Sequence, residues 1–289
     1  MINLKNKKIM ISIIILSIII IALIGVIIFG VMKGGTFSFL EKTTTLYNEE
    51  FSDITSISVN VKSYDVKIKE TNKDSIEVEI TGSSKNKDKI KVEQTENSLE
   101  INQEESIICI GLCLYDEAIT IYVPADYNIE YDHTSSSGSL EVEGVLTTGN
   151  IKTTSGDITL KGLENGEVNS TSGNIKIDNA QELNVNSTSG DIIVGKVNDI
   201  TLSATSGDVE IEEITNKISG NTTSGEIKIN KLAIKEDSNL EARSGDINIG
   251  LENKVFIDAK TNSGDIDIDN SNTNPILTIT TTSGDITAK

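Results

Sequence analysis

The stretch Thr153-Thr154-Ser155-Gly156-Asp157-Ile158-Thr159-Leu160 decides the fold, because its central pattern occurs nine times along the chain. Each copy has Ser-Gly, then Asp, Asn, Glu or Ser, then an aliphatic residue, and successive copies are 17 to 20 residues apart. The glycines of the nine copies are Gly138, Gly156, Gly173, Gly190, Gly207, Gly225, Gly245, Gly264 and Gly284. A self-similar period this short is typical of a solenoid and too short for a propeller blade or a helical repeat.

Polarity alternates on both sides of each Ser-Gly pair. The residues after the glycine read apolar-polar-apolar, as in Ile158-Thr159-Leu160, and a second alternation precedes the pair, as at Leu183 and Val185. Period-two alternation predicts short strands with one buried face. Two such strands cannot bury their apolar faces alone, so we expect stacked coils with like residues in columns about 4.8 Å apart. The predicted fold class is all-β, a single-chain β-solenoid (β-helix) of about 17 to 20 residues per coil.

The Ser-Gly pair is expected to be a structural corner. A sharp turn between strands commonly needs a positive φ, which glycine adopts without steric cost. The residue three positions before the glycine is always small in the last eight copies, as at Thr153, Ser170 and Ala204, and this suits a tight corner.

The region before the regular repeat is also rich in predicted strands. Residues 51–134 contain six such segments, and residues 57–68 follow the repeat template with Tyr64 in the glycine position. We interpret residues 51–134 as an N-terminal cap with diverged coils, with a separate β-sandwich as the alternative, and residues 135–289 as the regular solenoid. Covering the end of a solenoid protects otherwise exposed strand edges.

An apolar run occupies residues 9–32. Twenty-four residues at about 1.5 Å each reach about 36 Å, enough for a hydrocarbon layer of about 30 Å, so the run predicts one N-terminal transmembrane helix. Lys5, Lys7 and Lys8 precede the run and only Lys33 follows it closely, which predicts cytoplasmic residues 1–8. The expected localisation is the cell membrane, single-pass, with residues 33–50 as a linker and the rest extracytoplasmic.

Composition excludes some function classes. The chain has 289 residues and a formal net charge of -19, with 44 acidic and 25 basic side chains. Arg243 is its single arginine, and a nucleic-acid-binding surface needs a basic face, so no nucleic acid is expected as a partner. An acidic surface repels anionic polymers and attracts cations and cationic peptides.

The chain resembles the bacterial putative-adhesin family of β-solenoid proteins, a domain-of-unknown-function family that includes LiaG-like membrane-anchored proteins. The resemblance rests on the apolar N-terminal run, the lead-in Ile121-Tyr122-Val123-Pro124-Ala125-Asp126-Tyr127 and the tandem Thr-Ser-Gly-Asp-Ile corners. It covers the whole region after the apolar run. It implies a membrane-associated, extracytoplasmic and non-enzymatic protein, and it supplies no catalytic residues.

An acidic column follows the corners and is the strongest candidate for chemistry. Carboxylates stacked at about 4.8 Å repel one another, and a bound Ca²⁺ would relieve that repulsion. The weak calcium candidates are Asp157, Asp191, Asp208, Asp246, Asp265 and Asp285, with Asn174 and Glu226 in the same column. The favoured alternative is that each side chain only accepts a backbone N–H bond at the turn.

Other conspicuous residues have structural interpretations. Thr154, Thr171, Thr188, Thr205 and Thr223 are expected to form an outward column, for which binding of ice or a repeating glycan is the less favoured interpretation. His133 is expected to point inward and Arg243 outward into solvent. Cys109 and Cys113 are buried small side chains or, if Gly111 makes a turn, a disulfide. No zinc-binding, phosphate-loop or nucleophile-elbow motif occurs.

The sequence therefore predicts a membrane-anchored binding or scaffold protein, an adhesin or an envelope-stress accessory, and no enzyme. The alternatives are a passive structural or cation-binding rod and a glycan-active β-helix enzyme. No cofactor is expected, and the expected partners are the membrane and a cell-wall polymer or an envelope protein. The oligomeric state stays open.

Overall fold

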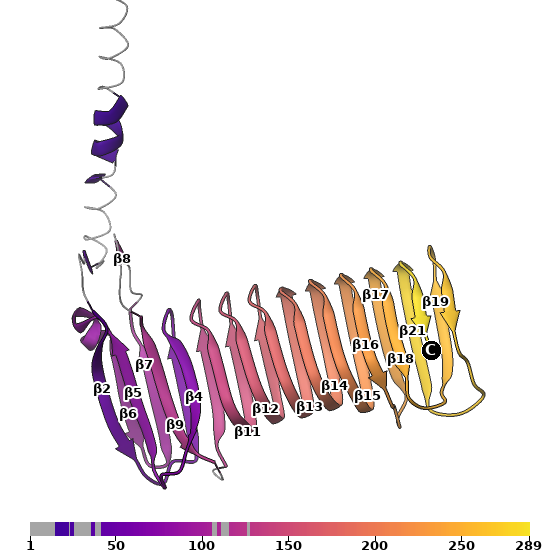
Figure 1. Cartoon of the computed structure of the whole chain (residues 1–289), viewed down its shortest axis with the longest axis horizontal. Helices are drawn as coiled ribbons and strands as arrows, with labels where there is room; N and C mark the ends of the chain where they lie inside the picture. The colour runs from indigo at the N-terminus through magenta and orange to yellow at the C-terminus, as the bar shows by residue number, and fades with distance from the viewer. Residues whose placement is uncertain are drawn as a thin grey trace, which may run out of the picture.

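The repeat folds into one long rod of stacked coils (Figure 1). The computed structural model describes residues 15–22, 24–25, 36–37, 42–105, 109–110, 116–125 and 128–289. The regular part consists of β10 (Glu130–Ser135), β11 (Leu140–Thr153), β12 (Ile158–Ser170), β13 (Ile175–Ser189), β14 (Ile192–Ser206), β15 (Val209–Ser224), β16 (Ile227–Leu232), β17 (Ser238–Ser244), β18 (Ile247–Leu251), β19 (Phe256–Thr261), β20 (Ile266–Ile268), β21 (Ile276–Ser283) and β22 (Ile286–Ala288). The predicted β-solenoid is confirmed.

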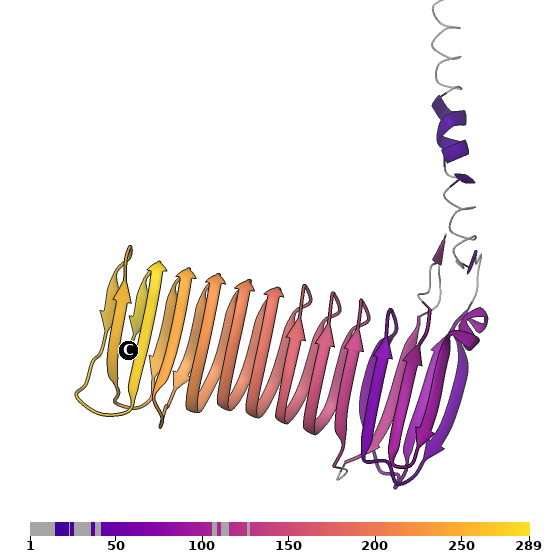
Figure 2. The same cartoon turned by 180° about the vertical axis from the view of Figure 1, so that it is seen from behind.

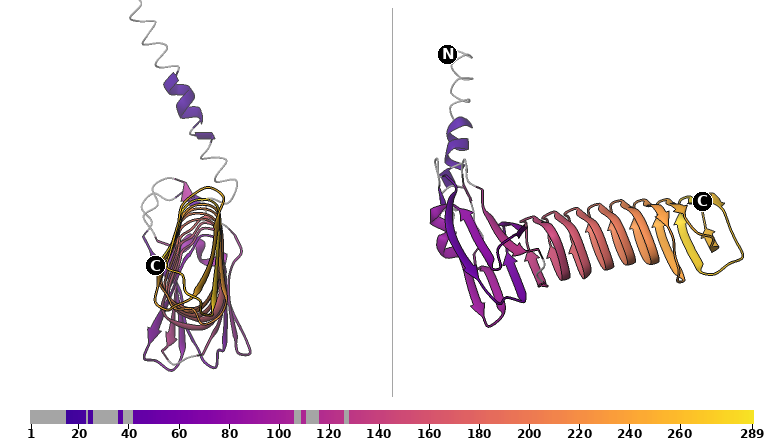
Figure 3. Two further views of the ribbon diagram at one scale, coloured as in Figure 1. Left: turned by 90° about the vertical axis from the view of Figure 1, so that its right-hand side faces the viewer. Right: turned by 60° about the horizontal axis from the view of Figure 1, so that its bottom comes forward.

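Neighbouring coils pair in parallel and in register. Ile158, Ile175, Ile192 and Val209 lie side by side on β12 to β15, and each is at most 1 % exposed. Strands β11 to β15 are long because each bends and continues from one long side of its coil to the other (Figure 2). Because successive side chains of a strand point to opposite faces, the apolar residues of both sides meet inside the rod. Seen from its end, each coil is a narrow, flattened ring (Figure 3).

A cap of antiparallel strands closes one end of the rod. It contains β2 (Thr44–Phe51), β5 (Ile76–Gly82), β6 (Ile90–Thr95), β7 (Ser98–Gln103), β9 (Ala118–Pro124) and the 3₁₀ helix η1 (Ser84–Lys89). Antiparallel pairs join β2 to β5, β5 to β9, and β6 to β7. Two short strands, β1 (Thr36–Phe37) and β8 (Cys109–Ile110), form a separate parallel pair. The interior of the rod is therefore covered at this end.

The first coil of the sequence is not the first coil in space. It consists of β3 (Ser56–Val61) and β4 (Asp65–Thr71), and it lies between the β7/β9 coil and the β10/β11 coil. Its corner follows the repeat template, because the Asp65 carboxylate accepts the Ser139 backbone N–H at 2.9 Å. Tyr64 in the glycine position is fully buried.

The stacking order is also exchanged at the other end. β17 and β18 pair with β21 and β22, and these pair in turn with β19 and β20. The last coil of the sequence is therefore the penultimate coil of the rod, and the β19/β20 coil is outermost. The connections between β18 and β19 and between β20 and β21 supply the length for this exchange, which agrees with the longer repeats there, of 19 and 20 residues.

The predicted transmembrane helix and membrane localisation need correction. Within residues 9–32 the structure describes helix only at residues 15–22 and 24–25. Eight helical residues extend about 12 Å, well short of a hydrocarbon layer of about 30 Å. No helix among the described residues has both the length and the apolar character needed to cross a membrane. The cytoplasmic segment predicted at residues 1–8 lies outside the described residues.

The linker predicted at residues 33–50 is wrong in its second half. Strand β2 begins at Thr44, and Leu46 and Tyr47 pack against the core. These side chains cover the end of the cap, so the segment is part of the folded unit.

Candidate functional site on the side of the rod

The corner glycines are packed against one another from coil to coil. A Cβ atom on any of the nine corner glycines would lie less than 3.0 Å from the backbone of the neighbouring corner. Six of them, for example Gly207 with φ +108°, also have a positive φ, whereas Gly138, Gly156 and Gly173 do not. The sequence predicted the conformational reason for glycine. Close approach of the coils is the reason common to all nine positions.

Buried hydroxyl groups stabilise the same corners from inside. The side chains of Ser135, Thr153, Ser170 and Ser187 donate to the carbonyl of the corner glycine three residues later, over 2.7–3.2 Å. These residues are 2–6 % exposed. A buried carbonyl without a partner costs free energy, so this position favours a small side chain with a hydroxyl group.

The acidic column is a ladder of backbone caps. Oδ1 of Asp157, Asn174, Asp191 and Asp208 accepts the backbone N–H at the same position of the next coil, over 2.8–3.0 Å. The ladder continues through the exchanged coils, where Asp246 accepts the Asp285 N–H and Asp285 accepts the Asp265 N–H. Asn174 performs the same role without a charge. The described residues contain no group of three or more His, Cys, Asp or Glu side chains that could hold a metal.

Substitution of Asp208 separates the roles of its charge and its hydrogen bond. Asp208→Ala removes the acceptor of the Glu226 N–H, and we expect it to lower the free energy of unfolding by about 1 kcal/mol. Asp208→Asn keeps the acceptor, as Asn174 does, and we expect less than about half that loss. Urea denaturation of the two variants checks this, and equal losses would contradict a role through the hydrogen bond.

Calcium should not change the stability of the rod, because the carboxylates of the ladder already accept backbone N–H bonds at five of its positions, Asp157, Asp191, Asp208, Asp246 and Asp285. We expect the same melting temperature in EDTA and in millimolar Ca²⁺, measured by circular dichroism. A melting temperature that rises with Ca²⁺ would instead assign a cation to the acidic column.

The threonine column lies on the surface beside the corners. Thr154, Thr171, Thr188, Thr205 and Thr223 are exposed, as is Arg243 in the same row. Their outward direction was predicted, and it leaves a row of hydroxyl groups along one edge of the rod.

A shallow groove crosses four neighbouring coils on one long side of the rod. Gly166, Leu183 and Ile200 form its floor. Its polar walls are two outward columns. One has a member on each of the four coils, Asn165, Glu182, Asp199 and Lys217, and the other has a member on three of them, Asn184, Thr201 and Ser219. The groove offers amide, hydroxyl, carboxylate and ammonium groups at the spacing of the coils.

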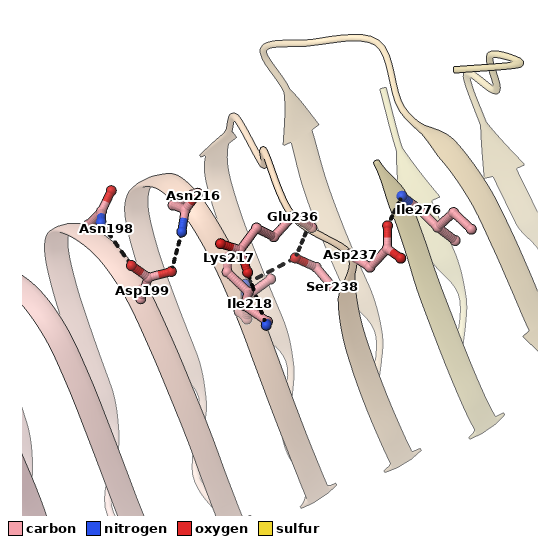
Figure 4. A network of polar contacts seen from close by, with 9 residues as sticks. All are labelled: Asn198, Asp199, Asn216, Lys217, Ile218, Glu236, Asp237, Ser238 and Ile276. Carbon is pink, nitrogen blue, oxygen red and sulfur yellow. Dashed lines mark hydrogen bonds and ion pairs between the residues drawn. The ribbon is translucent and has the colours of Figure 1, made fainter. Parts of the chain in front are cut away.

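One wall of the groove is held by a polar network at the bend opposite the glycine corners (Figure 4). The Asp199 carboxylate accepts bonds from the amides of Asn198 and Asn216, at 2.8 and 2.5 Å. The Lys217 ammonium pairs with the Glu236 carboxylate at 3.2 Å. These contacts restrict the side chains that line the groove before any ligand binds.

The same network joins coils whose connections differ in length (Figure 4). Ser238 Oγ accepts the Ile218 N–H at 3.1 Å, and Asp237 Oδ1 accepts the Ile276 N–H at 2.9 Å. At these two positions a side-chain oxygen accepts the backbone N–H that would otherwise bond to a backbone carbonyl of the next coil. Nothing in the sequence repeat indicated this role or the groove, because both depend on the less regular half of each coil.

A second depression lies where the cap meets the regular coils. It has an apolar lining with Lys69 and Glu70 at its rim, and Val145 in it is 58 % exposed. The other apolar residues of the lining are Ile57, Ile68, Val123, Pro124, Ala125, Ile129, Val142 and Leu146.

Comparison with known proteins assigns the chain to a family. A family model described as Toastrack DUF4097 matches residues 54–196 and, a second time, residues 180–289. The chain belongs to the Toastrack DUF4097 family. None of the curated proteins compared with it matches.

Solved structures share the Toastrack fold at low sequence identity. A putative adhesin from Parabacteroides distasonis is 14 % identical with a TM-score of 0.54, and the match covers 88 % of this chain and 100 % of that one. A putative adhesin from Parabacteroides merdae is 13 % identical with a TM-score of 0.51, covering 87 % and 98 %. A putative lipid binding protein from Parabacteroides distasonis is 18 % identical with a TM-score of 0.50, covering 87 % and 99 %. At these identities the likeness concerns the fold.

The one histidine of this Toastrack chain is part of its core, as predicted. His133 is 1 % exposed and lies between Val59 and Ile151 of the neighbouring coils. Its Nδ1 is 3.2 Å from the Tyr131 hydroxyl, and the two rings stack with centroids 6.0 Å apart. Burial lowers the pKa of the His133 imidazole to about 4 from an ordinary value of 6.5.

Acidification should therefore destabilise the fold through His133. Because its folded pKa is below the ordinary value, the unfolded chain takes up the proton first, and the stability contribution present above pH 6.5 is lost as the pH falls toward 4. We expect wild type to lose more urea resistance than His133→Leu between pH 7 and pH 5, where carboxylate titration affects both proteins equally. Equal losses would contradict a buried neutral imidazole.

The two alternatives for Cys109 and Cys113, buried small side chains or a disulfide, stay untested. Cys113 lies outside the described residues, and Cys109 is described only as part of strand β8.

Proposed function

We propose that this Toastrack chain is a non-enzymatic, adhesin-type binding rod that holds a repeating, hydroxyl-rich polymer, a cell-wall glycan, along its lateral groove. The observation that carries the proposal is the pair of polar columns around the groove, one with a polar side chain on each of four successive coils and the other on three of them. A repeating ligand meets a repeating surface and gains from several weak contacts at once.

Charge narrows the class of polymer. The chain carries a net charge of -19, and like charges oppose the approach of anionic wall polymers. A neutral or amino-bearing glycan avoids this repulsion. The names of the solved relatives, adhesins and a binding protein, support binding over catalysis.

Cosedimentation of the full chain with isolated cell-wall sacculi tests the proposal. We expect wild type to pellet with sacculi, including sacculi stripped of anionic polymers. The double variant Glu182→Ala, Thr201→Ala removes two exposed groove side chains and should reduce retention. The matched control Thr159→Ala, Glu210→Ala makes the same change in composition on exposed positions outside the groove and should bind like wild type.

Either of two outcomes would refute glycan binding at the groove. One is absence of wild-type retention, which favours a passive structural rod. The other is equal retention by the groove variant and the control, which moves the contact to another surface.

A second candidate function is the binding of the end of an acyl chain in the depression beside the cap, whose volume of about 30 Å³ admits a small apolar group. Its apolar lining with an exposed Val145 supports this candidate, and one solved relative is named for lipid binding. We expect palmitate to displace a fluorescent apolar probe from wild type and less from Val145→Asp, with Ile193→Asp as the exposed control. Equal displacement in the two variants would exclude the depression as the binding site.

A further inference from the structure

Among the described residues, no strand pairs with the outward side of the outermost coil of the rod, whereas every other regular coil has a neighbour on each side. Ile266 occupies the column position of Ile247 and Ile286, which are fully buried, yet it is 43 % exposed. Ile268, the next residue of β20 that faces the interior of the rod, is only partly buried. Apolar side chains directed at a missing coil thus remain open to solvent.

The strand edges of this coil are open as well. Within the described residues, β19 pairs only with β21 and β20 only with β22. Because the backbone groups of a parallel strand alternate between its two neighbours, those of Ala259, Thr261, Ile266 and Ile268 are directed outward. We call the outward edges of β19 and β20, with Ile266 and Ile268, the outer face.

One part of the outer edge is already covered. The Asn270 side chain accepts the Ile257 N–H and donates to the Ile257 carbonyl, both at 2.9 Å, and so replaces a neighbouring strand at that point. Open strand edges promote association, and proteins commonly block them. Here the block stops at Ile257 and leaves the rest of the edge available.

We propose that the outer face docks on the outer face of a second copy of this chain, so that two rods join end to end. An extended peptide could cover only one of the two open strands, whereas a second outer face presents two strands and the apolar residues between them. The antiparallel cap closes the opposite end, so association ends with a pair and does not continue into a filament.

On β19, charge complementarity favours this occupant, whereas the β20 edge is acidic apart from the Asp267–Lys289 ion pair. Asp258 and Lys260 flank Ala259 on β19 and lie 3.2 Å apart as an ion pair. Antiparallel pairing of two β19 strands about Ala259 sets Asp258 of each copy opposite Lys260 of the other, and opposite charges in this cross-strand position attract. The contact covers one coil only, so a weak, concentration-dependent dimer is expected.

Sedimentation equilibrium of the full chain at increasing concentration tests the proposal. We expect a monomer–dimer equilibrium whose dissociation constant rises about tenfold or more in Ile266→Lys, because the variant places a charge in the contact. Ile193→Lys is the matched control, since Ile193 is 44 % exposed on the side of the rod, and it should dimerise like wild type. Both substitutions are made in the full chain, so any association through other segments is the same in the two variants. Equal melting temperatures confirm that both variants fold.

Charge exchange tests the arrangement of the two copies. Asp258→Lys and Lys260→Asp should each dimerise less than wild type, and an equimolar mixture of the two should restore dimers. A wild-type chain that stays monomeric, equal dimerisation of Ile266→Lys and Ile193→Lys, or a mixture that stays monomeric would each overturn the proposal.

Discussion

Replacing Ile192 with alanine is expected to lower the free energy of unfolding by about 2–5 kcal/mol. Ile192 is fully buried between Ile175 and Val209 of the adjacent coils. Its truncation leaves a cavity that the stacked backbones cannot close, because their ladder hydrogen bonds fix the distance between coils.

The adjacent residue provides the control for this substitution. Ile193 is 44 % exposed, so Ile193→Ala should change the free energy of unfolding by less than about 0.5 kcal/mol. Urea denaturation followed by circular dichroism measures both. Similar losses would contradict the inward and outward assignment of the strand, and with it the register of every coil.

Gly207→Ala is expected to lower the free energy of unfolding by about 2–4 kcal/mol. Two effects combine at this corner. The φ of +108° is unfavourable for alanine, and the new Cβ would lie 2.5 Å from the Gly190 carbonyl oxygen. The atoms that the Cβ would meet belong to the Gly190 backbone, so the corner cannot relax without separating the two coils.

Ser206→Ala is the control for the corner. Ser206 is exposed beside Gly207, and its replacement should leave stability almost unchanged. An unchanged urea midpoint in Gly207→Ala would show that the corners do not set the distance between coils.

Much of the regular coil could be predicted because each residue has a similar neighbour above and below. The alternation at Ile158-Thr159-Leu160 predicted the buried face, and the match of Tyr64 and Asp65 to the corner template corresponds to the β3/β4 coil. Hydrophobic periodicity carries this information directly.

The order of the coils could not be predicted for the same reason. Ile247, Ile266 and Ile286 have the same local pattern, so any of the three coils could stack on either of the others. The connections and the polar contacts of Asp237 and Asn270 decide the order, and no repeat describes them. Register in sheets is weakly specified where neighbouring strands are alike.

The candidate site shows a similar division. The corner residues follow from the repeat, whereas the groove depends on outward residues of the less regular half-coil. There the pairing shifts register, so that Lys217 lies beside Asp199. The transmembrane prediction rested on hydropathy alone, and no helix among the described residues has the length and apolar character that it requires.

Hydrogen exchange of the full chain with and without soluble cell-wall glycan fragments tests the central claim most directly. The account predicts slower exchange on ligand addition over residues 165–167, 182–184 and 199–201, which border the groove. It predicts no change in exchange at the threonine column or at the outer face. Protection confined to those other surfaces, or no protection at all, would contradict a glycan-binding groove on the side of the rod.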